Sequence, residues 1–320
     1  MRKLGLIAFA LACTVTAAAA DYPDKAIRFV VPQAPGSNTD LYARLIGAEM
    51  SKSLGQQVII DNRPGGAFVI GLDAIAKAPP DGYTIGMGLI GGMALTPHMV
   101  AKLPYDVLKD FEPIGLVGRG HLILVVSPQL PVKSVKELID YAKQNPGKLT
   151  AASSANGSPG HIGLELFKSL TGTKITHVPY RGGAAAINDL IAGRIDIMFE
   201  GLASIAPFVL DNRLRALGVS SDHRLAAFPE VPTLAEAGVP GYLAVTWLGV
   251  IAPAKTPRPI IERLNRALNA ALKSPVLVER FKLIGEEPAP GTPQDYAQVI
   301  KTDFAKWKAV IESANIKLGE

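Results

Sequence analysis

The chain has 320 residues, of which 48% are hydrophobic and 19% charged, and its formal net charge is +5 at pH 7. This composition excludes a disordered chain, and the sequence lacks the repeats of collagen or coiled coils. No run approaches the several apolar stretches of roughly 18 residues that a multi-span membrane protein needs, so we expect a compact protein of about two domains.

The first predicted element is a secretory signal peptide at residues 1–20. Arg2 and Lys3 form a basic start, residues 4–11 are apolar, and a run of small residues ends at Ala20. Cleavage near Ala20 would leave a formal charge of +3 and would remove Cys13, the one cysteine. We therefore expect an exported protein without cysteine chemistry, whose small and evenly spread positive charge does not indicate nucleic-acid binding.

The rest of the chain alternates short apolar strands with amphipathic helices, the pattern of an α/β architecture with mainly parallel strands. Strands are predicted at residues 27–31, 58–61, 83–88, 148–152, 174–178, 194–199 and 214–220. Helices are predicted at residues 40–54, 67–77, 134–145, 161–170, 184–192, 257–273 and 292–314, and another opens after residue 200.

Two longer extended segments, near residues 119–127 and 243–252, flank a middle block that holds a complete α/β set. We interpret them as crossovers between two lobes. Lobe 1 would comprise residues 21–123 and 246–320, and lobe 2 residues 124–245. Two crossings predict a hinged pair of lobes with a cleft, a common place for a small-ligand site.

Three loops share one design, at residues 34–40, 153–161 and 180–184. Each leaves a strand through small, hydroxyl, amide or glycine residues and enters a helix, whose unpaired N–H groups and positive dipole end accept an anion. A single loop of this kind is usually only a capped turn, but three of them indicate a site. Arg181 could clamp an anion there, and Glu200 could receive a ligand amine or hydroxyl or merely cap the next helix.

Other motifs are weaker. Residues 86–91 match the dinucleotide fingerprint G-x-G-x-x-G, but Pro97 shortens the stretch in which its helix would have to open. The five histidines show no metal-ligand spacing, and no carboxylates cluster beside them in the sequence, so we expect no metal and no cofactor. Neither G-x-S-x-G nor H-E-x-x-H occurs, so no catalytic residue is assigned, although a triad of distant residues stays open.

Several runs, taken in order, resemble the Bug/TctC family of periplasmic solute-binding proteins, the extracytoplasmic component of tripartite tricarboxylate transporters. In lobe 1 they are Asn62-Arg63-Pro64-Gly65-Gly66 and Pro80-Asp81-Gly82-Tyr83-Thr84. In lobe 2 they are Ser158-Pro159-Gly160-His161, Val178-Pro179-Tyr180-Arg181-Gly182-Gly183 and Val231-Pro232-Thr233. The resemblance implies a type II periplasmic-binding fold that closes on its ligand, a small organic carboxylate held largely by backbone groups and ordered water.

The resemblance also implies the binding residues. From the loop after the first strand they are Gln33, Ala34, Ser37, Asn38, Thr39 and Asp40. From the second lobe they are Ser154, Ala155, Asn156, Gly157, Ser158, His161, Tyr180, Arg181, Gly182 and Glu200. Three departures from the family pattern concern the identity of the ligand. Ser37-Asn38 replaces the usual Gly-Gly or Gly-Ser, and Glu200 stands where Asp is commoner. Residues 90–94 are apolar where many relatives carry hydroxyls.

The resulting hypothesis is a monomeric periplasmic binding protein, not an enzyme, that presents a carboxylate to membrane permease subunits. Two alternatives stay open: a binding module that signals to a sensor kinase ectodomain, and a secreted hydrolase that uses the same cleft. The sequence leaves the kind of carboxylate open.

Overall fold

The computed structural model describes residues 22–180 and 182–318, so the predicted signal peptide and Arg181 lie outside the described residues. In lobe 1, three parallel strands lie in the order β2-β1-β3, and β9 continues the sheet antiparallel to β3. These strands are β1 (Ile27–Val31), β2 (Val58–Asn62), β3 (Thr84–Leu89) and β9 (Val245–Pro253).

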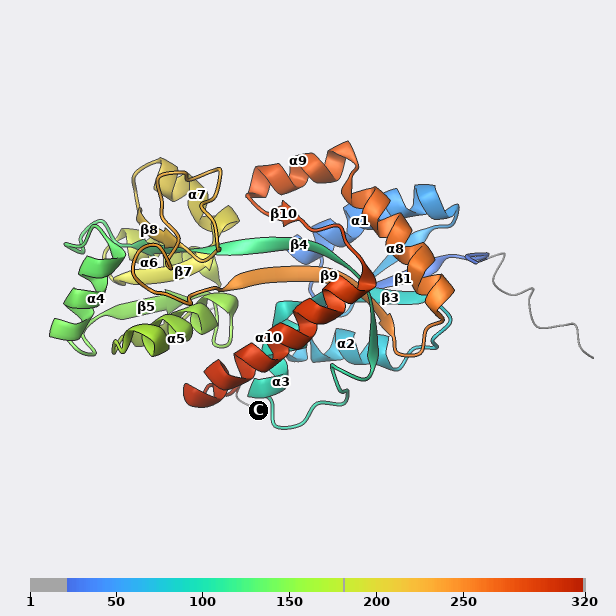
Figure 1. Ribbon diagram of the computed structural model, residues 1–320, viewed down its shortest axis with the longest axis horizontal. Helices are drawn as coiled ribbons and strands as arrows, with labels where there is room; N and C mark the ends of the chain where they lie inside the picture. Colours follow the sequence, from blue (N-terminus) through green and yellow to red (C-terminus); the bar gives the residue numbers. More distant parts are fainter. Residues whose placement is uncertain (1–21, 181, 319–320) are drawn as a thin grey trace, which may run out of the picture.

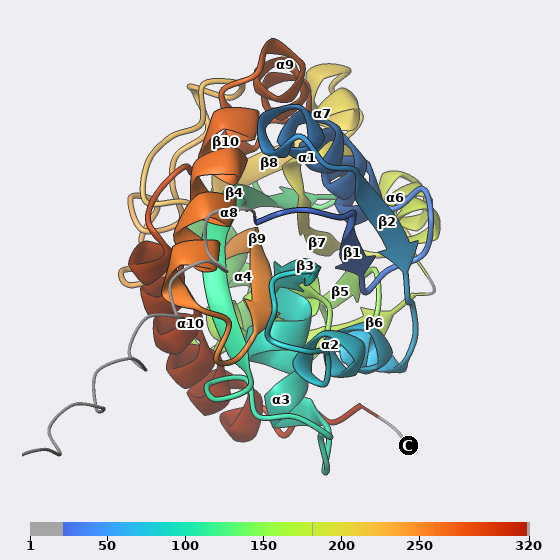
Figure 2. The ribbon, with the colours of Figure 1, turned by 90° about the vertical axis from the view of Figure 1, so that its right-hand side faces the viewer.

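Helices cover both faces of this sheet (Figures 1 and 2). One face carries α1 (Asn38–Leu54), α8 (Arg258–Leu272) and α9 (Pro275–Ile284). The opposite face carries α2 (Val69–Ala76), α3 (Thr96–Met99) and α10 (Pro293–Ser313). The helix starts follow the sequence signals: Thr292 caps α10 in a reciprocal capping box with Asp295.

Lobe 2 is a smaller α/β unit in which three parallel strands lie in the order β7-β5-β6. These strands are β5 (Thr150–Ser153), β6 (Thr176–Pro179) and β7 (Ile197–Gly201). One face packs α4 (Val135–Gln144) and α5 (Pro159–Thr171), and the other packs α6 (Gly183–Ile191) and α7 (Leu202–Leu210).

The two lobes share one strand, β4 (Phe111–Val126), which is 16 residues long. Its first part pairs with β9 as far as His121. From Leu122 onward it pairs instead with β7 and with β8 (Arg215–Val219). In Figure 1 this strand and β9 run between the left-hand lobe 2 and the right-hand lobe 1. Both segments predicted as crossovers are therefore extended strands.

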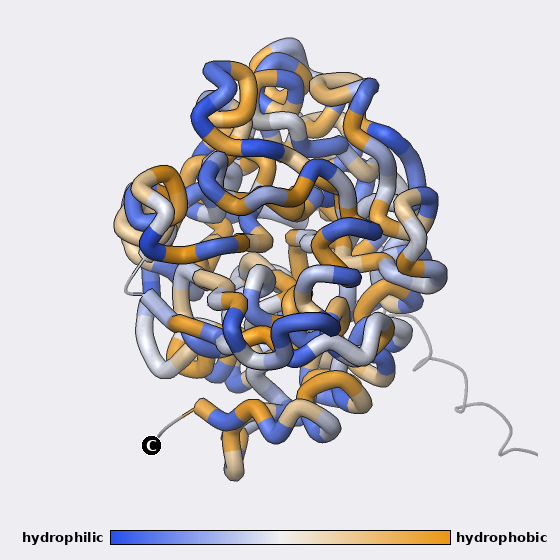
Figure 3. Tube along the Cα trace, turned by 90° about the vertical axis from the view of Figure 1, so that its left-hand side faces the viewer, coloured by the Kyte–Doolittle hydropathy of each residue, from blue (hydrophilic) through white to orange (hydrophobic). Residues whose placement is uncertain are grey.

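One apolar core continues through both lobes. It contains residues of β4 on either side of the lobe change, such as Leu116 and Leu124, together with Phe167 of α5 and Trp307 of α10. Seen from the end of lobe 2, hydrophilic and hydrophobic stretches alternate along the chain (Figure 3), as expected of elements that bury one face each. No helix of the described residues has the length and apolarity needed to cross a membrane.

Two features differ from the sequence-based expectations. A π-helix at Gly91–Leu95 and then the short α3 follow β3, where the sequence analysis predicted no helix. Pro97 lies in the first turn of α3, where its missing N–H is not needed. Helix α9 was also not predicted, although it has Pro275 in its first turn and ends at Gly285 in a left-handed conformation.

Candidate ligand-binding cleft

A cavity of about 890 Å³ lies where the two lobes meet. Lobe 1 contributes the β1–α1 loop, Phe68 and the end of β3; lobe 2 contributes the β5–α5 loop and the start of α7. The shared strands contribute Gly120, His121 and the segment 246–248. The cavity is therefore bounded by both lobes and by the strands that connect them.

Three helices begin at the wall of this cavity. Ser37, Ser158 and Gly201 are the residues at the N-caps of α1, α5 and α7, and all three line the cavity. Both serines are true caps, because the Ser37 Oγ accepts from the Asp40 N–H at 3.2 Å and the Ser158 Oγ accepts from the His161 N–H at 3.4 Å. Three positive dipole ends at one cavity favour a negatively charged occupant.

The β1–α1 loop is fixed by Asp40, which lies behind the cavity wall. Its buried carboxylate accepts hydrogen bonds from the Gly36 N–H at 2.8 Å, Asn62 Nδ2 at 2.9 Å and Arg44 Nε at 3.0 Å. Burial acts to raise the pKa of Asp40, but these hydrogen bonds outweigh it and hold the pKa below its usual range. Asp40 therefore positions the loop without lining the cavity.

The β5–α5 loop is fixed in a similar way by His161. The Gly157 N–H donates to His161 Nδ1 at 3.0 Å, so this nitrogen is unprotonated. The ring of His161 stacks on His177 with centroids 3.6 Å apart, and burial lowers the pKa of His177 to about 4. Both rings are packed behind the loop, so His161 shapes the cavity wall without being part of it.

Two carboxyl groups and one guanidinium line the cavity. Asn38 joins two of them, because its Oδ1 accepts from Arg280 at 3.0 Å and its Nδ2 donates to Glu286 at 3.3 Å. Burial raises the pKa of Glu286, against the opposing hydrogen bond from Tyr42. The lobe 1 side of the cavity is thus a polar network in which Asn38 connects Arg280 to Glu286.

Glu200 provides the second carboxyl group, at the end of β7. Its Oε1 accepts from the Gly201 N–H at 2.9 Å, whereas its buried Oε2 has no hydrogen-bond partner among the residues that the structure describes. Burial raises the pKa of Glu200. Burial thus favours the protonated form of this carboxyl group, which can donate a hydrogen bond to a ligand.

The structure brings together ten of the sixteen residues expected to bind the ligand. These ten, which line the cavity, are Gln33, Ser37, Asn38, Thr39, Ser154, Ala155, Asn156, Gly157, Ser158 and Glu200. Five others do not line it: Ala34, Asp40, His161, Tyr180 and Gly182. The sixteenth, Arg181, lies outside the described residues.

The loop after β6 therefore differs most from its predicted place. The Tyr180 hydroxyl donates to Asp189 of α6 at 2.8 Å, away from the cavity. The Gly182 N–H donates to the Ser154 carbonyl at 2.9 Å, so this loop supports the β5–α5 loop from behind.

Sequence reasoning also missed part of the cavity wall. The apolar wall residues Phe68, Met99 and Trp247 cannot be distinguished from core residues by sequence alone. The polar wall residues Arg280 and Glu286 belong to α9, which was not predicted, and to the segment after it. The start of a helix at Ser274-Pro275 was the available signal for that region, because Pro is favoured in a first helical turn.

The comparisons with known proteins agree on one family. A family model described as the tripartite tricarboxylate transporter family receptor matches residues 42–316. A solved R. palustris protein with adipate is 40% identical, covers 93% of this chain and 99% of its own, and superposes with a TM-score of 0.78. MatC from Rhodopseudomonas palustris, solved with bound malate, is 31% identical, covers 91% and 100%, and has a TM-score of 0.76. The periplasmic binding protein BugD is 30% identical, covers 92% and 99%, and has a TM-score of 0.75.

Proposed function

Because the chain belongs to the tripartite tricarboxylate transporter receptor family, we propose that it captures a small organic carboxylate between its lobes and delivers it to the membrane permease subunits of such a transporter. The family and the two-lobed α/β binding-protein fold that the sequence motifs indicated are confirmed by this membership and by the solved relatives. The signal-like segment at residues 1–20 supports a periplasmic location for the chain.

The observation that carries the proposal is the convergence of three helix N-termini on one cavity. Backbone N–H groups at these ends can hold a carboxylate without a dedicated charged side chain. α1 belongs to one lobe and α5 and α7 to the other, so a ligand with a carboxylate at each end would meet a helix start on both sides. The adipate and malate of the solved relatives are both dicarboxylates, which favours this class of ligand here.

We further propose the boundaries of the lobes, and we propose which site residues contact the ligand and which position the loops. The pairing of β4 changes after His121, and β9 begins at Val245, which supports a division at residues 123/124 and 245/246. The ten cavity-lining residues named above would contact the ligand, while Asp40 and His161 would position the two loops. Closure of the lobes would then bend the chain at β4 and at the entry to β9.

The hydrolase alternative receives little support from the serine–histidine geometry. Ser153 Oγ lies 2.6 Å from His177 Nε2, but Ser153 is fully buried and donates its hydroxyl to the Ala155 carbonyl. His177 is half-buried under His161, and its pKa of about 4 makes it a poor general base. Binding without chemistry therefore remains the better proposal.

A thermal-shift panel tests the ligand class directly. Residues 21–320, unfolded and refolded to remove any carried-over ligand, would be melted with mono-, di- and tricarboxylates, aromatic acids, amino acids and neutral sugars. A ligand at about 100 times its Kd stabilises by about 2.7 kcal/mol, which moves the Tm by several degrees. A shift with dicarboxylates supports the proposal, whereas a shift confined to sugars would remove the carboxylate assignment.

A genetic experiment distinguishes delivery of the carboxylate to a permease from signalling to a sensor. Deleting the gene for this chain is expected to abolish uptake of the radiolabelled carboxylate, and deleting the permease genes should do the same. Loss of carboxylate-induced gene expression with uptake intact would instead favour the sensor ectodomain as the partner. Light scattering of the liganded chain would test the predicted monomer.

Glu200→Gln is expected to flatten the pH dependence of carboxylate affinity. Below its raised pKa, Glu200 is neutral and can donate to the ligand; above that pKa, it is an anion next to an anion. Because burial places this pKa above the ordinary 4.5, the wild-type affinity should fall as the pH rises through it. Calorimetry at a series of pH values above 4.5 should find a loss on the order of tenfold, the effect of a one-unit pKa difference between free and bound protein.

Glu112→Gln is the matched control, because burial also raises the pKa of Glu112, which does not line the cavity. This variant should keep the wild-type pH profile of affinity. A Glu200→Gln protein that retained the full pH dependence would show that another group in the cleft is responsible.

A further inference from the structure

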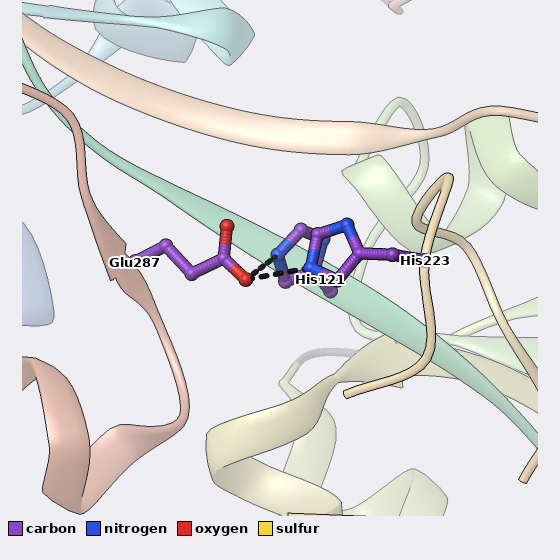
Figure 4. A group of neighbouring side chains, drawn as sticks. All are labelled: His121, His223 and Glu287. Carbon is purple, nitrogen blue, oxygen red and sulfur yellow. Dashed lines mark hydrogen bonds and ion pairs between the residues drawn. The ribbon is translucent and has the colours of Figure 1, made fainter. Parts of the chain in front are cut away.

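Beside the cleft, which His121 also lines, two histidines and a glutamate from distant parts of the chain converge at the junction of the lobes (Figure 4). His121 lies on β4, His223 follows β8 in lobe 2, and Glu287 begins β10 (Glu287–Pro288), which pairs with β4 from lobe 1. The expectation that no carboxylates cluster beside the histidines is therefore wrong: Asp222 directly precedes His223 in the sequence, and the fold brings Glu287 to both histidines.

The distances suit a small cation. His223 Nε2 lies 2.8 Å and His121 Nε2 3.6 Å from the same Glu287 oxygen, and one ligand atom from each of the three residues falls within 4.8 Å of the others. Around a tetrahedral Zn²⁺ with bonds of about 2.0–2.2 Å, ligand atoms lie about 3.3–3.5 Å apart. Shifts of about 1 Å or less in these side chains would therefore complete three coordination bonds.

The surroundings of the two imidazoles also suit metal ligands. The side chain of His121 is 2% exposed, and neither of its ring nitrogens has a hydrogen-bond partner among the described residues, an arrangement that calls for an explanation. His223 Nδ1 lies 2.7 Å from Asp222 Oδ1, the outer carboxylate that typically orients a metal-bound histidine.

Space and charge around the three residues also permit an ion. A cavity of about 280 Å³ adjoins them and leaves room for water at the remaining coordination positions. Its charged wall residues besides Glu287 are Asp222, Asp303 and Arg119, so three carboxylates face one guanidinium. Two imidazoles with a carboxylate form a donor set that suits Zn²⁺ and related divalent transition ions better than Ca²⁺ or Mg²⁺.

We infer that His121, His223 and Glu287 form a binding site for a divalent transition-metal cation of the Zn²⁺ type, which joins lobe 2 to lobe 1 beside the crossover strands. Two of the ligands lie on opposite lobes and the third on the strand that both lobes share. The cation would therefore stabilise the lobe arrangement in which all three side chains meet.

Zinc titration of the chain without a polyhistidine tag tests the site and requires no carboxylate ligand. Calorimetry of residues 21–320 with ZnCl₂ near neutral pH should give one tight equivalent, and Zn²⁺ should raise the Tm. His223→Ala and Glu287→Gln should each weaken zinc binding more than about tenfold, since even loss of an outer-shell partner typically costs 10–100-fold. Both side chains are about half exposed, so these variants are expected to fold.

His98→Gln is the control for histidine content, because His98 contacts Phe304 on α10 and is not part of the cluster. It should bind zinc as the wild type does. In a second measurement, Co²⁺ in place of Zn²⁺ should produce visible absorption typical of a low-coordinate site, and this absorption should disappear in His223→Ala. The inference would be overturned if the wild type did not bind zinc, or if His223→Ala and Glu287→Gln both bound zinc as tightly as the wild type does.

Discussion

Ser158→Leu is expected to weaken carboxylate binding by more than about 100-fold, equivalent to about 2.7 kcal/mol. Ser158 lines the cavity at the start of α5, and its hydroxyl accepts from the His161 N–H. Leucine would place an apolar side chain over the helix end and would remove a polar group that can meet the ligand. Isothermal titration with the dicarboxylate selected by the thermal panel measures the loss.

Ser134→Leu is the control variant for the loss of a helix cap. Ser134 caps α4 in the same way, its Oγ accepting from the Glu137 N–H at 3.2 Å, but it does not line the cavity. Both variants should lose about 1 kcal/mol of stability, the usual cost of an N-cap. Only Ser158→Leu should lose affinity; wild-type affinity in that variant would mean that the ligand binds elsewhere.

Local signals account for the parts of this fold that the sequence predicts well. Ser37, Ser134 and Ser158 each precede a helix by one residue, and each side chain makes the capping hydrogen bond that this position implies. The long apolar run of β4 indicates a strand buried on both faces, which is what residues 122–126 form. These features depend on neighbours in the chain, so the sequence is sufficient to predict them.

The choice of which loops reach the cleft depends on the order of the strands. β7 lies next to the shared strand β4, whereas β6 lies at the edge of the sheet, two strands farther away. The end of β7, with Glu200 and Gly201, therefore lines the cavity, while Tyr180 after β6 turns back to Asp189. Both segments lead from a parallel strand into a helix, so only the topology separates them.

Contacts between distant residues are the second limit of the sequence analysis. His223 and Glu287 are 64 residues apart, and Asn38 and Glu286 are 248 residues apart. No spacing rule for helices or strands relates such positions. They meet because the chain crosses between the lobes twice and returns to lobe 1, which brings the segment after α9 against the start of α1 and against β4.

Gly160→Ala is expected to destabilise the protein by about 3 kcal/mol or more, at the upper end of the usual cost of overpacking. A Cβ atom at Gly160 would lie 2.2 Å from the carbonyl oxygen of Phe199, which is backbone and cannot rotate away. Phe199 pairs with Leu124 of β4, so relief of the clash would have to move α5 or disturb the strand pairing. Urea denaturation monitored by circular dichroism measures the change in the free energy of unfolding.

The sign of this effect is informative, because Gly→Ala within a helix ordinarily stabilises it by about 1 kcal/mol. Gly201→Ala is the matched control: a Cβ atom there meets nothing within 4 Å, and φ at Gly201 is −59°. It should change stability little, although it lies only two residues after Phe199. Equal stability of the two variants would contradict the close packing of α5 on β7. Since Ser158 and the β5–α5 loop depend on the position of α5, Gly160→Ala should also lower carboxylate affinity in the fraction that remains folded, whereas Ser134→Leu should not.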